Sequence, residues 1–485
     1  MPAEPVFEQD RNCWRIETAG RAAALVDGAE YFAQLDSALR QARQSILIVG
    51  WGFDGGIRLR PDIEDGEAAL PLGPLLRLLV ERNPELVVNV LVWSVAVVHA
   101  PGAPGPLLFG ADWQDHPRIR VRLDAQHPFY ASHHQKIVVV DDAVAFVGGI
   151  DLTLRRWDDA SHAAQHPLRV SEGVCYAPVH DVQMIVDGDA AMSVGDLARE
   201  RWRMATGEIL SRPQRSGEDI WPQDLPPDFR QQRVAIARSA PRWRGQRSVR
   251  EAARLTRDMI RAAKRSIYIE AQYLTAGYVR RALRRRLLER DGPEVLVIMT
   301  RASHGLVEQL VMGSNGERMI RRLRRADRYG RFRVYYPAVP GPDGDCSIQI
   351  HSKVIVVDDR LLRIGSSNLN NRSICVDTEC DLAIDASDRA ARSAVARFRD
   401  RLIAEHLDVA PAAFAAALAA EGSLLKAVER LNVNPRGLRL HAAMQVPGPT
   451  EPMPGTWFLD PRRLFDPRGI VRRTWRRLFA RREPV

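Results

Sequence analysis

The sequence has no long apolar segment. In 485 residues, of which 45% are hydrophobic, there is no run of about 18 apolar residues, the length that a membrane-spanning helix requires. The first residues, MPAEPVFEQDRNCWRIETAGR, also lack the apolar stretch of a secretory signal. We therefore expect a large globular protein of two to four domains without a membrane-spanning helix.

Cysteine is also scarce. The chain has five cysteines, which is an odd number. They are widely scattered, and none forms a Cys-x-x-Cys pair. This pattern argues against a disulfide framework or a cysteine-based zinc framework and favours a reducing compartment, so we expect a cytoplasmic location. The five are Cys13, Cys175, Cys346, Cys375 and Cys380.

Lysine is also scarce, and its positions reveal a repeated motif. Lysine and arginine together number 70, yet only Lys136, Lys264, Lys353 and Lys426 are lysines. Lys136 and Lys353 occupy the same position of a motif that occurs twice. A compact ammonium acts as a point charge on a phosphoryl oxygen, whereas a guanidinium needs a fork-shaped partner, so the choice of lysine indicates phosphate chemistry.

The repeated motif reads HHQKIVVVDDAVAFVGGID in the first copy and HSKVIVVDDRLLRIGSSN in the second, 217 residues later. Each copy has a histidine, then lysine at +2, aspartate at +7, glycine at +14 and a short polar residue at +17. The first copy contains His134, Lys136, Asp141, Gly148 and Asp151, and the second contains His351, Lys353, Asp358, Gly365 and Asn368.

The apolar run inside each motif, IVVV or VIVV, is typical of a strand buried on both faces. Side chains alternate along a strand, so the histidine and lysine of each copy point the same way. For one copy, a plain core strand with a polar beginning would explain the pattern equally well. Two copies with matched spacing favour a functional site.

These paired H-x-K-x4-D motifs, the GG and GS that follow them and the glutamate of VDTECD resemble the phospholipase D superfamily. RWD (Arg156 to Asp158), VHDV (Val179 to Val182) and IYIEAQYLT (from Ile267) are similar to the glycerophospholipid-cleaving members. The resemblance covers most of residues 30–405. It implies two lobes related by a pseudo-twofold axis, with both motifs meeting in one central cleft.

Repeated elements agree with an α/β fold. A helical segment followed by a strand at residues 33–51 has a counterpart at 253–273, and further apolar strands precede each motif. Helices alternating with strands predict a mostly parallel sheet in each lobe. We place the first lobe at residues 1–208, a linker at 209–245, the second lobe at 246–405 and a helical extension at 406–485.

Cleaving a phosphodiester requires a nucleophile, a proton for the leaving alcohol and cations that neutralise charge. The motif histidines can supply the first two, because imidazole titrates near neutrality. The resemblance implies that His134 forms a covalent phosphohistidine and that His351 is the general acid and later the general base. The near symmetry of the motifs leaves the two roles interchangeable from the sequence alone.

The remaining site residues have supporting roles. Lys136, Lys353 and Asn368 are expected to hold phosphoryl oxygens. Asp151 occupies the matching phosphate-binding position, but a carboxylate would repel phosphate, so we expect it to orient Lys136 or a headgroup. The resemblance implies Glu379 as the histidine-orienting acid of the second half and Asp181 as that of the first. We count Asp141 and Asp358 with the catalytic motif, although the resemblance implies a chiefly structural role, and we expect His133 to be structural.

The net charge of +10 is unevenly distributed. Residues 461–485 hold nine arginines against Asp466 and Glu483, a net +7, which leaves +3 for the other 460 residues. In this tail Val471, Trp475, Leu478 and Phe479 share one helical face surrounded by arginines, as in an interfacial helix on an anionic membrane. The alternative is a helix docked on the body of the protein.

The predicted function is hydrolysis of glycerophospholipids to phosphatidic acid and a headgroup alcohol, with transphosphatidylation as a further reaction. We expect a monomer that associates peripherally with membranes, with no cofactor, no catalytic metal and no nucleic-acid partner. A lysine two residues from each histidine would repel a metal ion, which argues against a metal-dependent phosphodiesterase. A nuclease or a cardiolipin synthase of the same superfamily and a non-catalytic lipid-binding protein remain as alternatives.

Overall fold

The computed structural model describes residues 5–94, 110–128, 131–171, 173–214, 219–301, 312–454, 456, 460 and 461. The predicted basic tail, apart from Pro461, lies outside the described residues. Within the described ranges, no single helix is long and apolar enough to cross a membrane, and one pair of consecutive helices, Arg389–Leu407 and Pro411–Glu421, meets the criterion only jointly across a bend of 106°.

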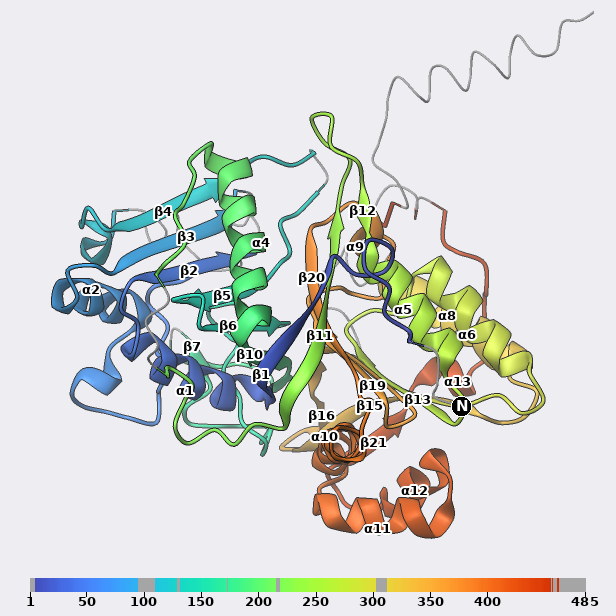
Figure 1. Ribbon diagram of the computed structural model, residues 1–485. Helices are drawn as coiled ribbons and strands as arrows, with labels where there is room; N and C mark the ends of the chain where they lie inside the picture. The colour runs from blue at the N-terminus through green and yellow to red at the C-terminus, as the bar shows by residue number, and fades with distance from the viewer. Residues whose placement is uncertain are drawn as a thin grey trace, which may run out of the picture.

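The first half is built around seven strands. Pairing runs in the order β1, β10, β6, β5, β2, β3, β4. Helices α1, α2 and α4 accompany these strands (Figure 1). The elements are β1 (Arg15–Val26), α1 (Asp27–Arg40), β2 (Ser45–Gly50), α2 (Leu72–Arg82), β3 (Val87–Trp93), β4 (Ile119–Asp124), β5 (Ile137–Val140), β6 (Val144–Gly148), the short β7 (Val170–Ser171), β8 (Val174–Cys175) and β9 (Val179–His180), β10 (Val182–Asp187) and α4 (Gly188–Thr206).

The second half repeats this order. Its strands pair as β11, β20, β19, β18, β13, β14, β15, each the counterpart of one strand in the first half. The elements are β11 (Phe229–Ala240), β12 (Val249–Arg250), α5 (Glu251–Ala262), β13 (Ser266–Ala271), α6 (Gly277–Leu288), β14 (Glu294–Met299), α8 (Ser314–Ala326), β15 (Phe332–Gly341), β16 (Gly344–Ser347), β17 (Gln349–Ile350), β18 (Lys353–Val357), β19 (Leu361–Gly365), α9 (Arg372–Cys375), β20 (Glu379–Asp385), α10 (Arg389–Leu407), α11 (Pro411–Glu421), α12 (Leu424–Leu431), β21 (Gly437–Leu440) and α13 (Ala442–Gln445).

Strands β1 and β11 join the two halves. They pair antiparallel, with Arg15 opposite Ile236 and Ala22 opposite Phe229, so a single sheet runs through the molecule. Figure 1 shows these two strands crossing the middle of the structure. The predicted linker at 209–245 is therefore wrong in part, because its residues 229–240 form a central strand whose second part is buried.

The α/β class is confirmed, but the sheet is mixed. Within the described part of the main sheet, parallel pairing is confined to β2, β3 and β4 and to β13, β14 and β15. The motif strands form antiparallel hairpins, β5 with β6 and β18 with β19, because three-residue connections are too short for a parallel crossover. The extension beyond residue 406 is not purely helical either, since β21 pairs with β15.

The motif strands are buried on both faces, as their composition predicts. Ile137 and Val139 pack in a core that also contains Val354 and Val356 of the second half. The intervening Val138 and Val140 pack in a core formed by the first half alone. One hydrophobic core is therefore shared between the halves.

The motif aspartates Asp141 and Asp358 lie in the turns that follow β5 and β18, in left-handed conformations with φ of 51° and 54°. The Asp141 carboxylate accepts hydrogen bonds from three backbone amides at the start of β2, those of Arg43, Gln44 and Ser45 (2.6–2.8 Å). Asp358 does the same at the start of β13, where the amides of Lys264, Arg265 and Ser266 donate at 2.5–2.9 Å. At ~3.3 Å per residue, each lies roughly 20 Å from its motif histidine, so their inclusion in the catalytic set is wrong.

We expect Asp141→Ala and Asp358→Ala each to lower the free energy of unfolding by about 2–4 kcal/mol, because three amides lose their acceptor and alanine disfavours positive φ. Asn variants, which tolerate this conformation, should lose less. Urea unfolding measures the effect. A stable alanine variant without activity on a soluble phosphodiester would instead give these residues a catalytic role.

Candidate active site

The segments that carry the two motif histidines each lie against the other half of the chain. The backbone N–H of His134 donates to the carbonyl of Thr378 (3.0 Å), and that of His351 donates to the carbonyl of His180 (2.8 Å). Strand β17, just before His351, pairs in parallel with β9. The two contacts are equivalent in the two halves, and they bring both histidines to the same region.

The acidic residues that follow these carbonyls hold the imidazole rings. Nδ1 of His134 lies 2.9 Å from Oε2 of Glu379, and Nδ1 of His351 lies 2.6 Å from Oδ2 of Asp181. The structure thus brings all four predicted residues together but crosses the pairs, so the expectation of one acid for the histidine of its own half is wrong. Within the described part of the chain, neither Nε2 has a hydrogen-bond partner, which leaves that atom to react.

The two motif lysines have different surroundings. Nζ of Lys136 lies 3.0 Å from Oδ2 of Asp151 and 3.1 Å from the carbonyl of His134. Asp151 also accepts from the amide of Trp51 (2.9 Å). The ion pair agrees with the expectation that Asp151 orients Lys136. Its oxygens are engaged by an ammonium and a backbone amide, which leaves it poorly suited to the phosphate-binding position that it occupies in the motif.

The second half has Asn368 where the first has Asp151, so Lys353 lacks that ion pair. Its Nζ instead contacts the carbonyl of His351 and lies 3.1 Å from Nδ1 of the same residue. Asn368 is 5% exposed, and its Oδ1 has no hydrogen-bond partner. Oδ1 is an acceptor and cannot bind a phosphoryl oxygen, so the Nδ2 donor of Asn368 would have to make that contact.

The buried surroundings of the site favour uncharged groups. Burial, followed by the charges of nearby lysines, holds the pKa of both His134 and His351 well below the usual value. Burial also lowers the pKa of Lys353 to about 7 and raises that of Glu379 to about 8. A phosphate anion would supply the negative charge that the cationic forms of the histidines and lysines lack, so the site is electrostatically suited to an anion.

Arg156 is a cation of this site that the sequence analysis did not identify as functional. Its charge contributes to lowering the pKa of both His351 and Lys353. Its Nε is buried without a hydrogen-bond partner. The available signal was its place in the RWD segment, five residues after Asp151.

Ser366, the serine of the second motif's GS, supports the Glu379 carboxylate. Its hydroxyl donates to Oε2 of Glu379 (2.6 Å) and accepts from the amide of Cys380 (3.0 Å). Gly149 takes the equivalent place in the first half and lies against Asp181, where a Cβ would come within 2.0 Å of Oδ1. A side chain at this position is therefore excluded beside Asp181, whereas beside Glu379 the serine side chain holds the carboxylate by a hydrogen bond.

Comparison with known proteins agrees with this geometry. The family model described as "Cardiolipin synthase, PLD-like domain" matches residues 256–402. Phospholipase D A of Dictyostelium discoideum is 23% identical over 479 residues, covering 80% of this chain and 35% of the relative. Phospholipase D2 of Bos taurus is 22% identical over 498 residues, covering 74% and 48% respectively.

These matches support the predicted resemblance of the chain to the phospholipase D superfamily. The chain spans less than half the length of these two curated relatives. Among solved structures, phosphatidylserine synthase of Haemophilus influenzae has a TM-score of 0.56 at 14% identity, with 80% of this chain and 88% of that chain covered. At this identity the likeness concerns the fold alone.

We expect a bell-shaped pH profile of kcat/KM for a nitrophenyl phosphodiester, whose leaving group needs no proton from His351, with its maximum between about 7 and about 8. Glu379 must be ionised to accept the Nδ1–H of His134, so activity falls as pH drops through its pKa. Lys353 must be protonated to bind phosphate, so activity also falls as pH rises through its pKa. kcat/KM is the informative parameter because it reports the free enzyme.

Glu379→Gln tests the assignment of the acidic limb. It should lower kcat/KM by on the order of 10²–10⁴ and abolish the limb due to Glu379, because an amide does not titrate. Lys353→Arg is the matched control and should move only the alkaline limb, upward. An acidic limb unchanged in Glu379→Gln would contradict the assignment.

Proposed function

We propose that this protein is a phospholipase D that hydrolyses the distal phosphodiester of a glycerophospholipid to phosphatidic acid and a headgroup alcohol. The observation that carries the proposal is the pair of histidines, His134 and His351, each held at Nδ1 by a carboxylate of the other half and followed by a lysine. The similarity to phospholipases D, which extends over most of the chain, supports a lipid substrate.

In the proposed first step, Nε2 of His134 attacks phosphorus and the bond to the headgroup oxygen breaks. His351, protonated once the phosphate anion is bound, gives its proton to that oxygen. Lys136, Lys353, Arg156 and Asn368 stabilise the non-bridging oxygens, where negative charge accumulates. In the second step, His351 takes a proton from water, which attacks the phosphohistidine and releases phosphatidic acid and His134.

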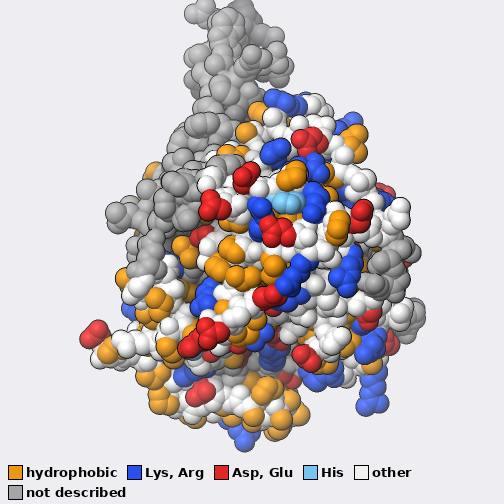
Figure 2. Space-filling model, turned by 90° about the vertical axis from the view of Figure 1, so that its left-hand side faces the viewer, with side chains coloured by type: hydrophobic (Ala, Val, Ile, Leu, Met, Phe, Trp, Pro, Cys, Tyr) orange, Lys and Arg blue, Asp and Glu red, His pale blue; other side chains and the backbone are white. Residues whose placement is uncertain are grey.

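A phosphatidyltransferase is the second candidate. The family model is described by a cardiolipin synthase, and the structural relative is a phosphatidylserine synthase. The same intermediate would serve both reactions, because only the acceptor differs: water in one and an alcohol in the other. A nuclease has less support, since basic and acidic side chains are interspersed on the visible face of the molecule rather than forming a basic groove (Figure 2).

A substrate panel distinguishes these functions. Purified protein is incubated with phosphatidylcholine, phosphatidylethanolamine and phosphatidylglycerol, with and without added glycerol, and separately with DNA. Mass spectrometry should find phosphatidic acid and free headgroup, and His134→Ala should abolish both. A predominance of phosphatidyl-alcohol at low glycerol would favour the transferase, and cleavage of DNA alone would overturn both lipid functions.

The histidine roles can be separated with a substrate whose leaving group needs no proton. With a nitrophenyl phosphodiester, we expect His351→Ala to release one equivalent of nitrophenol rapidly and then stall with the phosphoryl group on His134, because the base for water is missing. His134→Ala should give no burst. Both variants should reduce turnover by several orders of magnitude, about 10⁴-fold or more.

Alkaline quenching followed by peptide mapping locates the label, since phosphohistidine is unstable in acid. A label on His351 in the His134→Ala variant would invert the roles. Turnover by the wild type with no labelled histidine in either variant would contradict the two-step scheme.

The tail is proposed to hold the enzyme on anionic membranes. The chain leading to it is fixed at Asp460, whose carboxylate accepts from the amides of Asn371 and Arg372 (2.8 and 3.1 Å). Arg372 in turn pairs with Asp377, beside the segment that carries His134. Asp460, just before the tail, is therefore linked through Arg372 and Asp377 to the segment that carries His134.

Deleting residues 462–485 should strongly weaken sedimentation with anionic vesicles, because each basic residue contributes on the order of 1 kcal/mol to surface binding. Hydrolysis of a soluble phosphodiester should change little. Added salt should weaken binding of the full chain, since headgroup attraction is screened within roughly a Debye length. A truncated protein that unfolds or loses soluble activity would show that the tail is part of the fold.

A further inference from the structure

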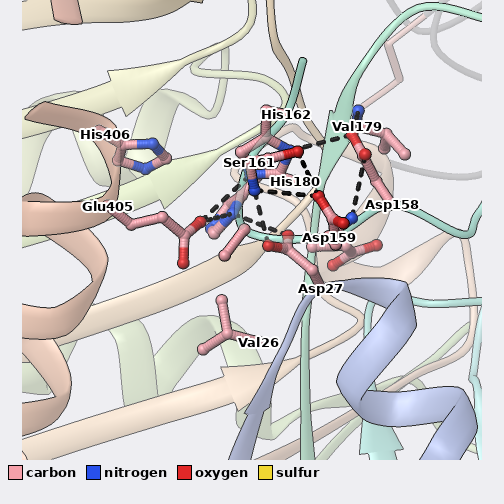
Figure 3. A network of polar contacts seen from close by, with 12 residues as sticks. Val26, Asp27, Asp158, Asp159, Ser161, His162, Val179, His180, Glu405 and His406 are labelled. Carbon is pink, nitrogen blue, oxygen red and sulfur yellow. Dashed lines mark hydrogen bonds and ion pairs between the residues drawn. The ribbon is translucent and has the colours of Figure 1, made fainter. Parts of the chain in front are cut away.

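A second cluster of histidines and carboxylates adjoins the candidate active site, because its member His180 directly precedes Asp181 in the chain. It consists of Asp27 at the start of α1, His162 in the loop after β6, His180 in β9 and Glu405 near the end of α10. The four side chains converge on one another (Figure 3). Three of them are at most 2% exposed and Glu405 is 8% exposed, so we call these residues the buried tetrad.

The distances within the buried tetrad are short enough for a coordination shell, because one ligand atom from each residue lies within 4.8 Å of the other three. Nε2 of His162 lies 3.3 Å from Oδ2 of Asp27 and 3.1 Å from Oε1 of Glu405. Nδ1 of His180 lies 3.0 Å from Oδ1 of Asp27 and 3.1 Å from the same Glu405 oxygen. A tetrahedron with metal–ligand bonds of ~2.0–2.1 Å has edges of roughly 3.3 Å.

Hydrogen bonds do not account for these short contacts. Both carboxylate oxygens of Asp27 and Nδ1 of His180 are buried and have no hydrogen-bond partner, although they lie about as close to one another as bonded atoms do. Only the contact between His162 and Glu405 has hydrogen-bond geometry. The atoms are therefore close together without being aligned for hydrogen bonds, which is the arrangement expected around a central ion.

The outer nitrogens of both histidines have carboxylate partners of their own. Nδ1 of His162 lies 2.9 Å from Asp158, and Nε2 of His180 lies 3.1 Å from Glu270. Metal-bound histidine almost always donates its other N–H to such an acceptor, which fixes the ring and its tautomer. Asp158 also forms an ion pair with the buried Arg169 (2.8 Å), so its negative charge is compensated.

The backbone is also held in unusual conformations at this place. Asp27 and His162 have φ values of 65° and 46°, in the left-handed region that side chains other than glycine rarely adopt. Such conformations cost of order 1–3 kcal/mol and persist where the surroundings determine them. Two of the four members of the buried tetrad are therefore strained into position.

We propose that the buried tetrad binds one Zn²⁺ ion, with Nε2 of His162, Nδ1 of His180 and one oxygen each of Asp27 and Glu405 as ligands. Two carboxylates neutralise the ion, and nitrogen and oxygen donors in a tetrahedron suit zinc among the divalent metals. The alternative is two protons in place of the ion, one on each histidine, which carries the same charge but requires hydrogen-bond geometry that most of these contacts lack.

This ion is separate from the phosphate chemistry. The proposed catalytic cations are Lys136, Lys353 and Arg156, and none of them is a member of the buried tetrad. The ion would instead join the halves, because Glu405 comes from the second and the other three ligands come from the first. The expectation of no catalytic metal is unaffected, and the proposal does not depend on the identity of the substrate.

Metal content is the direct test. The full-length protein, purified without chelator from zinc-supplemented cells, should contain one zinc per chain by inductively coupled plasma mass spectrometry. Asp27→Asn and Glu405→Gln should each lower the zinc content about tenfold or more after dialysis, because each removes a charged ligand. Asp142→Asn, which alters a buried carboxylate paired with Arg199 elsewhere (2.7 Å), is the control and should retain zinc.

A measurement on the wild type keeps the test decisive if the variants do not fold. Diffraction data on the two sides of the zinc absorption edge should give an anomalous peak between the four ligand atoms. Protein expressed in cobalt-supplemented medium should bind cobalt at the same site and show the intense visible absorption bands of tetrahedral coordination. Zinc-free protein with no such peak, or zinc retained in both ligand variants, would overturn the proposal and leave two protonated histidines in its place.

Discussion

The structure depends on the docking of each motif onto the other half of the chain. A backbone hydrogen bond fixes the amide of each histidine, and the next residue of the opposite half supplies the carboxylate for its ring. These contacts require both halves to be in place at once, which the antiparallel pairing of β1 with β11 and the shared core provide. The site is thus a product of the whole sheet rather than of either motif strand.

Because the site is buried, each charged side chain in it depends on a nearby partner. Removing an ion from water costs several kcal/mol unless a partner compensates it. Asp151 compensates Lys136 in the first half, but the equivalent Asn368 leaves Lys353 to the backbone and to its own histidine. The two halves therefore have equivalent strands but differ by one carboxylate near the motif lysine. This difference in charge is a physical basis for different roles of the two motif histidines.

The local features were predictable from the sequence. The motif strands were recognisable because burial on both faces demands a continuous apolar run, and the motif histidines and lysines because matched spacing identified them. Glu379 and Asp181 followed only from the family resemblance. The crossed pairing was not, since a repeat aligns residues within each half and carries no information about contacts between halves. Strand β11 was missed because a polar connection runs directly into it, with exposed residues such as Arg230 and Gln231 in its first part.

Arg156 and the buried tetrad were missed for a related reason. Asp27 and Glu405 are 378 residues apart and belong to no spaced pattern, so only the fold brings them together. His162 and His180 each read as an isolated histidine. A site assembled from the ends of several elements leaves little trace in sequence periodicity, whereas a site on one strand leaves a clear one.

The crossed acids have a consequence for how such a chain can change over generations. Glu379 acts on a histidine 245 residues earlier in the chain, and Asp181 acts on one 170 residues later. If the two halves descend from a duplicated ancestor, that ancestor had to pair with a second copy of itself to complete its site. After fusion, neither repeat can drift alone, because a substitution in one alters the reactivity of the histidine in the other.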